Sequence, residues 1–210
     1  MFIKPMLARL QNSLGRDDLI EQMVLLPEPK KSFSPGSAGL GSVNLIVGYS
    51  ASPKSHTALD IAFWIAHQTR LATNAVVKVH AVYVEVNKSQ NQYLHVFDFE
   101  HNQQQRSPHP LSYHISQPMT STLRENSAYT ATKQGDKILE QARNLAEEWE
   151  SSFESHLCFG RIGSELRKIV ELSAAGILFL GCRSVHHPLI QTLGDRFPCA
   201  VLGIPHCIDD

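Results

Sequence analysis

The 210-residue sequence lacks the features expected of a membrane-embedded or nucleic-acid-binding protein. No apolar run approaches the roughly 18 residues that a membrane-spanning helix needs. Lys and Arg number 19 against 20 Asp and Glu, a net charge of −1, and no basic stripe interleaved with aromatic residues is present. Pro5 and Arg9 fall where a signal peptide needs an unbroken apolar segment. We therefore expect no secretion signal, no nucleic-acid partner and no membrane contact.

Cysteine is also scarce, and its spacing forms no CxxC pair and no disulfide framework. This pattern favours reduced thiols and a cytoplasmic location. The four residues are Cys158, Cys182, Cys199 and Cys207.

A metal site is suggested only by His186 and His187, with His206 and Cys207 further along the chain. Adjacent histidines in a loop point in different directions, and no carboxylate or cysteine follows at ligand spacing. We expect solvated loop histidines and no metal.

Residues 1–42 look like an addition to the main domain. Apolar residues recur at helical spacing over 2–24 and predict one or two short helices. The stretch PEPKKSFSPGSAGLGS (27–42), rich in Pro, Gly and Ser, predicts a flexible linker. The main domain then spans 43–210.

That domain opens with a strand–helix–strand unit. VNLIVGY (43–49) is a buried strand, Ser52 is a good helix N-cap, and Pro53 suits the first helical position. The helix extends to about Leu71, and the β-branched run 75–86 is the second strand. The two strands should be parallel with a right-handed crossover.

Residues 87–132 interrupt this pattern. They are rich in Gln, Asn, Ser, His and Pro and show no sustained period. This composition predicts an insertion that is mostly disordered or that folds only against a partner.

Regular structure resumes near Gly135 with an amphipathic helix, followed by a strand at 155–163 and a helix capped by Ser164. Two apolar runs, ILFL (177–180) and AVLGI (200–204), complete the chain as buried strands. The order of elements predicts an open α/β sheet with helices on both faces.

Three segments together resemble the universal stress protein family, which has the adenine-nucleotide alpha-hydrolase-like fold. They are NLIVGYSASPKSHTALDIAFWIA (44–66), GRIGSELRKIVELSAAGILFLGCRS (160–184) and LGDRFPCAVLGIP (193–205). The resemblance implies an open five-stranded parallel sheet in the order 3-2-1-4-5. It also implies a homodimer paired through the last strand, and a ligand crevice where strands 1 and 4 diverge.

Many members of this family bind ATP through Gly-x2-Gly-x9-Gly followed by Ser or Thr. This sequence keeps Gly181 and Gly194, but Ser184 replaces the second glycine and Asp195 replaces the hydroxyl residue. Ser50 stands where ATP-binding members carry Asp at the end of strand 1. A carboxylate near phosphate repels it, so we expect weakened ATP binding, with Arg183 and Arg196 as compensating cations.

The binding residues implied by the resemblance lie in the turn after strand 1, in strand 2 and in the altered loop. They are Ser50, Ala51, Ser52, Pro53, Val84, Gly181, Arg183, Ser184, Gly194, Asp195 and Arg196. The implied ligand is ATP or AMP, with Mg.

Three functions remain open. The first is a non-catalytic, cytoplasmic stress-response or signalling protein that binds an adenine nucleotide at the altered site. The second is a nucleotide-independent dimeric scaffold that presents its N-terminal helices and the 87–132 loop to a protein partner. Weak ATP hydrolysis comes third, because no general base, no G-x-S-x-G elbow and no catalytic residue can be identified.

Overall fold

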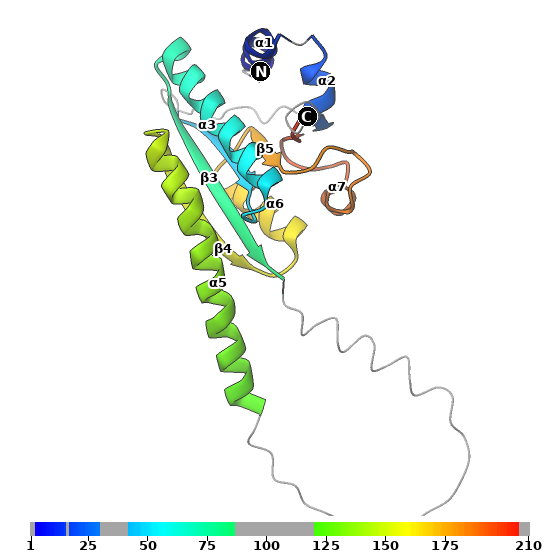
Figure 1. Ribbon diagram of the computed structural model, residues 1–210. Helices are drawn as coiled ribbons and strands as arrows, with labels where there is room; N and C mark the ends of the chain where they lie inside the picture. Colours follow the sequence, from blue (N-terminus) through cyan, green and yellow to red (C-terminus); the bar gives the residue numbers. More distant parts are fainter. Residues whose placement is uncertain (1–2, 16, 30–41, 87–119, 206–210) are drawn as a thin grey trace, which may run out of the picture.

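The computed structural model describes residues 3–15, 17–29, 42–86 and 120–205 and shows an α/β fold (Figure 1). Six strands form one mixed sheet in the order β1-β6-β5-β2-β3-β4. They are β1 (Val24–Leu26), β2 (Ser42–Gly48), β3 (Val76–Glu85), β4 (Ser152–Phe159), β5 (Ile177–Leu180) and β6 (Ala200–Leu202).

The five strands β2 to β6 are parallel to one another and keep the relative order that the family resemblance implies. The prediction of a five-stranded, wholly parallel sheet is nevertheless wrong, because β1 adds a sixth strand that runs antiparallel to β6. The predicted strand at 155–163 also lies earlier in the chain, at Ser152–Phe159.

Helices cover both faces of the sheet, as predicted. They are α1 (Ile3–Leu14), α2 (Leu19–Met23), α3 (Pro53–Thr73), α5 (Thr120–Glu148), α6 (Ile162–Leu172) and α7 (Pro188–Leu193). In the described part of the chain, none of these is both long enough and apolar enough to cross a membrane.

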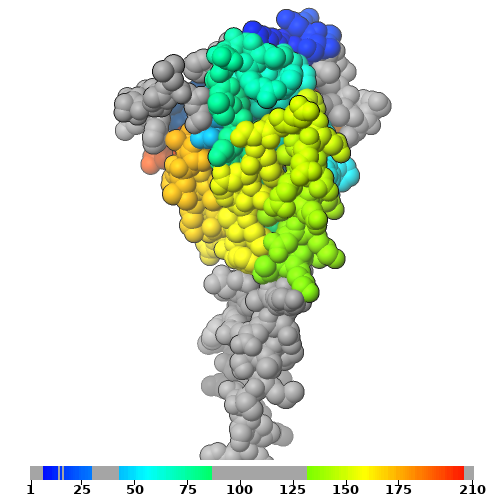
Figure 2. Space-filling view, turned by 90° about the vertical axis from the view of Figure 1, so that its left-hand side faces the viewer, coloured from blue at the N-terminus to red at the C-terminus, as the bar shows by residue number. Residues whose placement is uncertain are grey.

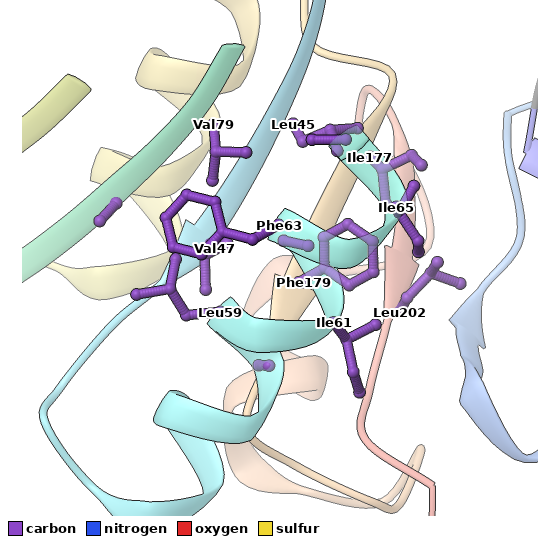
Figure 3. Packing of buried hydrophobic residues seen from close by; sticks show 14 of the residues in the cluster. Leu45, Val47, Leu59, Ile61, Phe63, Ile65, Val79, Ile177, Phe179 and Leu202 are labelled. Carbon is purple, nitrogen blue, oxygen red and sulfur yellow. The ribbon is translucent and has the colours of Figure 1, made fainter. Parts of the chain in front are cut away.

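Each face has its own apolar core. Phe63 of α3 packs against Val47 and Phe179 of the central strands (Figure 3), and the buried residues of α5 join the same cluster. On the opposite face, Leu166 of α6 packs with Ile46, and α7 contributes to this second cluster. The central strands are therefore buried on both sides, which is why they are continuous apolar runs.

The start of α3 follows the predicted local chemistry. Ser52 is its N-cap, and the Ser52 hydroxyl oxygen accepts a hydrogen bond from the Ser55 N–H at 3.2 Å. Pro53 occupies the first turn, where its missing N–H costs nothing. Asn74 ends the helix in the left-handed conformation with φ 56°.

The predicted insertion at 87–132 is partly wrong, because α5 already begins at Thr120. Residues 87–119 lie outside the described residues. Figure 1 shows the first part of α5 extending past the sheet. Gly135 brings the helix close to β4, since a Cβ there would lie 2.5 Å from Leu157 Cδ1.

Apolar residues of α1 and α2 pack against the main domain. Leu7 of α1 and Leu19 and Met23 of α2 are buried in the same core cluster as α3. The linker predicted over 27–42 falls largely on 30–41, outside the described residues.

The edge of β6 is covered by β1. Val24 pairs with Leu202, Leu26 pairs with Val201, and the Gly203 N–H donates to Met23 O at 2.7 Å. The outer edge of the last strand is therefore already paired within the chain. A homodimer stays a prediction, and pairing through β6 would require β1 to leave first.

Replacing Leu19 with Ala tests the docking of the N-terminal segment. Leu19 is fully buried, so the change should lower the free energy of unfolding by about 2–5 kcal/mol in urea titrations followed by circular dichroism. Leu172→Ala is the matched control, because Leu172 is 83% exposed. Equal stability of the two variants would show that this segment does not pack on the domain.

Candidate functional site

The candidate site lies at the carboxyl ends of the neighbouring parallel strands β2 and β5. The chain leaves β2 into α3 on one face and leaves β5 toward α7 on the other, so a crevice opens between them. A cavity of about 310 Å³ occupies this position. Its lining residues come from the ends of β2, β3 and β5 and from α6 and α7: Gly48, Tyr49, Ser50, Ser52, Ser55, Val82, Tyr83, Val84, Ile162, Leu166, Leu180, Gly181, Cys182, His187 and Leu189.

Three serines form one wall at the N-terminus of α3. The Ser50 hydroxyl donates to Ser52 Oγ at 3.2 Å, and the Ser55 hydroxyl donates to Ser52 O at 2.9 Å. The Ser50 N–H donates to Ser55 Oγ at 3.2 Å. Ala51 makes this tight turn with φ 57°, a conformation that costs a residue with a Cβ roughly 1 kcal/mol. The turn thus presents hydroxyl groups beside the positive end of the helix dipole.

Gly181 lies directly against the start of α3. A Cβ at Gly181 would lie 2.7 Å from the Lys54 carbonyl carbon and 2.8 Å from Ser55 N, both backbone atoms. Only glycine allows this approach of β5 to the helix. The first glycine of the altered motif is therefore required by packing, whatever ligand the cavity holds.

The loop after Gly181 folds on itself. Ser184 Oγ accepts from the His186 N–H at 3.1 Å, and Ser184 O accepts from the His187 N–H at 3.0 Å. His187 caps α7, its Nδ1 accepting from the Leu189 N–H at 3.2 Å. Ser184 is not among the residues with positive φ. In this structure the turn does not need the conformation that the missing glycine would supply.

Gly194, Asp195 and Arg196 lie at the far end of α7. Gly194 is its C-cap with φ 71°, and Asp195 and Arg196 are exposed. The Arg167 guanidinium donates to Leu193 O at 3.1 Å and to Arg196 O at 3.0 Å, holding this end of the loop on α6. None of the three predicted residues lines the cavity.

The structure thus divides the predicted binding residues. Ser50, Ser52, Val84 and Gly181 line the cavity. The others do not: Ala51, Pro53, Arg183, Ser184, Gly194, Asp195 and Arg196.

Sequence reasoning missed the apolar walls, chiefly Ile162, Leu166 and Leu189. Their helical positions carry no motif. Only the spatial approach of α6 and α7 to the strand ends brings them to the cavity.

Three titratable side chains of the cavity, Tyr49, Tyr83 and Cys182, favour their neutral forms. Burial raises the pKa of Tyr49 to about 12, helped by the Asp60 charge. Burial likewise raises the pKa of Tyr83 to about 12, with a further contribution from its hydrogen bond to Glu85, and the pKa of Cys182 to about 11. The described lining residues include no Asp, Glu, Lys or Arg.

A second cavity of about 270 Å³ lies at the other end of the sheet, where His67, Arg70, Trp149 and Glu150 surround the start of β3. It faces the C-terminal end of α3, whose carbonyl groups disfavour anions. The cavity between β2 and β5 faces the opposite end of the same helix, so it is the better candidate for a phosphorylated ligand.

No protein-family model and no curated protein matches the sequence. Solved structures do match it. A universal stress protein from Lactobacillus plantarum is similar with a TM-score of 0.52 at 14% identity, over 77% of this chain and 97% of that chain. This chain has the universal stress protein fold.

Two further structures are similar at lower scores. A universal stress protein family protein from Arabidopsis thaliana, solved with AMP bound, has a TM-score of 0.48 at 14% identity over 77% and 90% of the two chains. A protein of the same family from Burkholderia pseudomallei has a TM-score of 0.47 at 16% identity over 77% and 95%.

Replacing Gly181 with Ala tests the packing that forms the crevice in this universal stress protein fold. The new methyl group would collide with the backbone of α3, so the free energy of unfolding should fall by about 1–3 kcal/mol in chemical denaturation. Gly176→Ala is the control, because a Cβ there meets nothing within 4 Å. If Gly181→Ala is as stable as its control, α3 and β5 are further apart than described.

Proposed function

We propose that this protein is a non-catalytic stress-response or signalling protein that binds an adenine nucleotide in the cavity between β2 and β5. The observation that supports this most is the position of the cavity, at the switch point of the sheet and beside the N-terminus of the long helix α3. The universal stress protein fold agrees with this position at the level of fold alone.

The cavity walls suit the two halves of a nucleoside. Val84, Ile162 and Leu166 provide apolar surface from β3 and α6, against which a purine ring would pack. Ser50 and Ser52 provide hydroxyls on the opposite side for ribose or phosphate oxygens. Such a division, mostly apolar with a few placed polar groups, is typical of small-molecule sites.

The phosphate end favours a short phosphate chain. The Ser55 and His56 N–H groups at the start of α3 already donate to Ser52, which leaves less of the helix terminus for an anion. The described lining has no cation for a triphosphate and no carboxylate for Mg²⁺. We therefore propose AMP or a similar monophosphate as a better ligand than Mg-ATP.

The same lining supports the proposal that the protein is not an enzyme. Phosphoryl transfer needs cations around the phosphates and a group that orients the nucleophile. Tyr49, Tyr83 and Cys182 hold their protons at neutral pH, since their pKa values are about 12, 12 and 11. Slow ATP hydrolysis is the functional hypothesis that the cavity lining favours least.

A nucleotide-independent scaffold is the second candidate. It is favoured by Gly181, which packing explains without a ligand, and by the placement of Ser184 and Asp195 outside the cavity. As a scaffold the protein would act through its surfaces, in the cytoplasm and as the predicted homodimer. Leu7, Leu19 and Met23 are buried within the chain, so these apolar residues would not be the partner-binding surface.

Calorimetric titration with adenosine, AMP and Mg-ATP tests the proposed function. We expect AMP to bind at least as tightly as Mg-ATP. Leu189→Trp, which places a larger side chain at the cavity, should weaken AMP binding about tenfold, equivalent to about 1.4 kcal/mol. Leu71→Trp is the control, because Leu71 is exposed and lies outside this cavity.

Three outcomes would contradict the proposal. If none of the three ligands binds, the scaffold function is preferred. If Mg-ATP binds much more tightly than AMP, cationic residues outside the described lining must hold the phosphates. Release of inorganic phosphate during the ATP titration would contradict the non-catalytic proposal.

A further inference from the structure

A second group of chemically reactive side chains lies on β3 and β4, away from the nucleotide cavity. His80 of β3 and Glu154 of β4 are register partners, and His156 lies two residues further along β4, on the same face of the sheet. Their ligand atoms all lie within 4.8 Å of one another. None of the three lines the cavity between β2 and β5, so the two sites are independent.

We propose that His80, Glu154 and His156 bind a divalent transition-metal ion, with Zn²⁺ as the best-suited ion. Two imidazoles and one carboxylate are ligands that zinc accepts, and a three-ligand set leaves one position open to water or substrate. Imidazole ligands disfavour Mg²⁺ and Ca²⁺, which prefer oxygen.

The distances are close to those that zinc needs. His80 Nδ1 lies 3.0 Å from His156 Nε2, and these nitrogens lie 3.9 Å and 3.7 Å from the nearest oxygens of Glu154. Two nitrogens that each lie about 2.0–2.1 Å from a tetrahedral ion are about 3.3 Å apart. All three ligands would surround one ion if the two imidazole nitrogens moved slightly apart and the Glu154 carboxylate moved slightly closer to them.

Asn44 of β2 fixes which nitrogen of His80 faces the site. The Asn44 side-chain amide donates to Ser173 O at 2.6 Å, and a carbonyl oxygen can only accept, so Asn44 Oδ1 faces His80 Nε2 at 3.4 Å. Nε2 of His80 therefore carries the proton, and Nδ1 presents its lone pair toward His156 and Glu154. Metal-ligating histidines usually have such an outer partner.

The proton balance is simple. Without metal, His156 Nε2–H donates to His80 Nδ1. With metal, that proton moves through solvent to Nδ1 of His156, so both imidazoles stay neutral and the ion takes the place of the proton. Burial lowers the pKa of both histidines, which favours the neutral form that binds metal.

The site is open on one side. The side chain of His80 is 6% exposed and that of Glu154 is 48% exposed, so the ion would enter from the Glu154 side. Figure 2 shows residues of β4 at the molecular surface beside α5, and among the described strands only β3 pairs with β4. The fourth coordination position would therefore face solvent.

Lys78 is the group that opposes metal binding. Its ammonium nitrogen lies 3.4 Å from Glu154 Oε2. Burial disfavours ionisation of Glu154, but the hydrogen bond from Lys78 and the two histidines outweigh it and lower the pKa of Glu154. Because Lys78 is half-exposed and flexible, it can turn into solvent when an ion neutralises Glu154. Lys78 therefore makes the affinity for Zn²⁺ lower than the three ligands alone would give.

The test uses the full-length protein after removal of metal by a chelator. Zn²⁺ affinity is measured by competition with a chromophoric chelator, and Co²⁺ is added separately to record the visible absorption of a low-coordinate site. We expect one ion per chain. His156→Gln and Glu154→Gln should each weaken Zn²⁺ binding by roughly 10–100-fold or more. Loss of a residue that only orients a ligand typically costs this much, and these two residues are ligands themselves.

Two further variants keep the test decisive. Lys78→Met removes the competing charge and should tighten Zn²⁺ binding by about threefold or more, in the opposite direction to the ligand variants. A His186→Gln, His187→Gln double variant removes exposed loop histidines outside the cluster and should bind Zn²⁺ as the natural protein does. Circular dichroism of each metal-free variant verifies folding.

The proposal is overturned if the natural protein binds no Zn²⁺ at micromolar concentration. It is also overturned if the loop double variant, and not the His156 variant, loses the ion, since the metal would then lie in the α7 loop. A Lys78→Met variant that binds Zn²⁺ no more tightly than the natural protein would contradict the position of the ion beside Glu154.

Discussion

The contact on which the site depends is the approach of Gly181 to the first turn of α3. The backbone of Gly181 lies so close to the backbone of Lys54 and Ser55 that no room is left for a Cβ. The contact closes one side of the crevice and holds the end of β5 beside the three serines after β2. It also explains a glycine that sequence comparison alone would assign to phosphate binding. The cavity thus forms because the chain leaves the neighbouring strands β2 and β5 toward opposite faces of the sheet. Its ligand preference depends on the side chains around it.

The two edges of the sheet differ in what covers them. At one edge, β1 pairs with β6, and α1 and α2 bury their apolar residues in the main core. An exposed edge strand is an aggregation hazard, and covering it from within the chain removes that hazard. At the other edge, β4 presents Glu154 and His156, and His80 of β3 lies beside them. Charged and polar side chains at an edge discourage pairing with another chain and, in this protein, have the composition of a metal site.

Features fixed by a few neighbouring residues could be predicted from the sequence. Ser52 and Pro53 define the start of α3, and the apolar runs define β2, β3 and β5, because each depends on local chemistry. The relative order of the five parallel strands came from the family resemblance. The same resemblance implied four residues that line the cavity, Ser50, Ser52, Val84 and Gly181.

What could not be predicted depends on contacts between distant parts of the chain. β1 continues a helical apolar pattern, and only its pairing with Leu202 makes it a strand. The start of α5, from Thr120, is rich in polar residues, and its composition alone does not distinguish a helix from a disordered insertion. His80, Glu154 and His156 meet only through the register of β3 with β4, which no short motif encodes. Asp195 was assigned to the site by motif spacing, whereas the geometry of α7 places it outside.

The central claim is that the crevice between β2 and β5 is the ligand site. Backbone amide NMR spectra recorded during addition of AMP to ¹⁵N-labelled protein test it most directly, because they locate the ligand residue by residue. We expect the shifts to be concentrated at Ser50, Ser52, Gly181 and Cys182, with the amides of His80 and His156 unchanged. Shifts concentrated instead around Arg70 and Trp149, at the second cavity, or no shifts at saturating AMP, would contradict it.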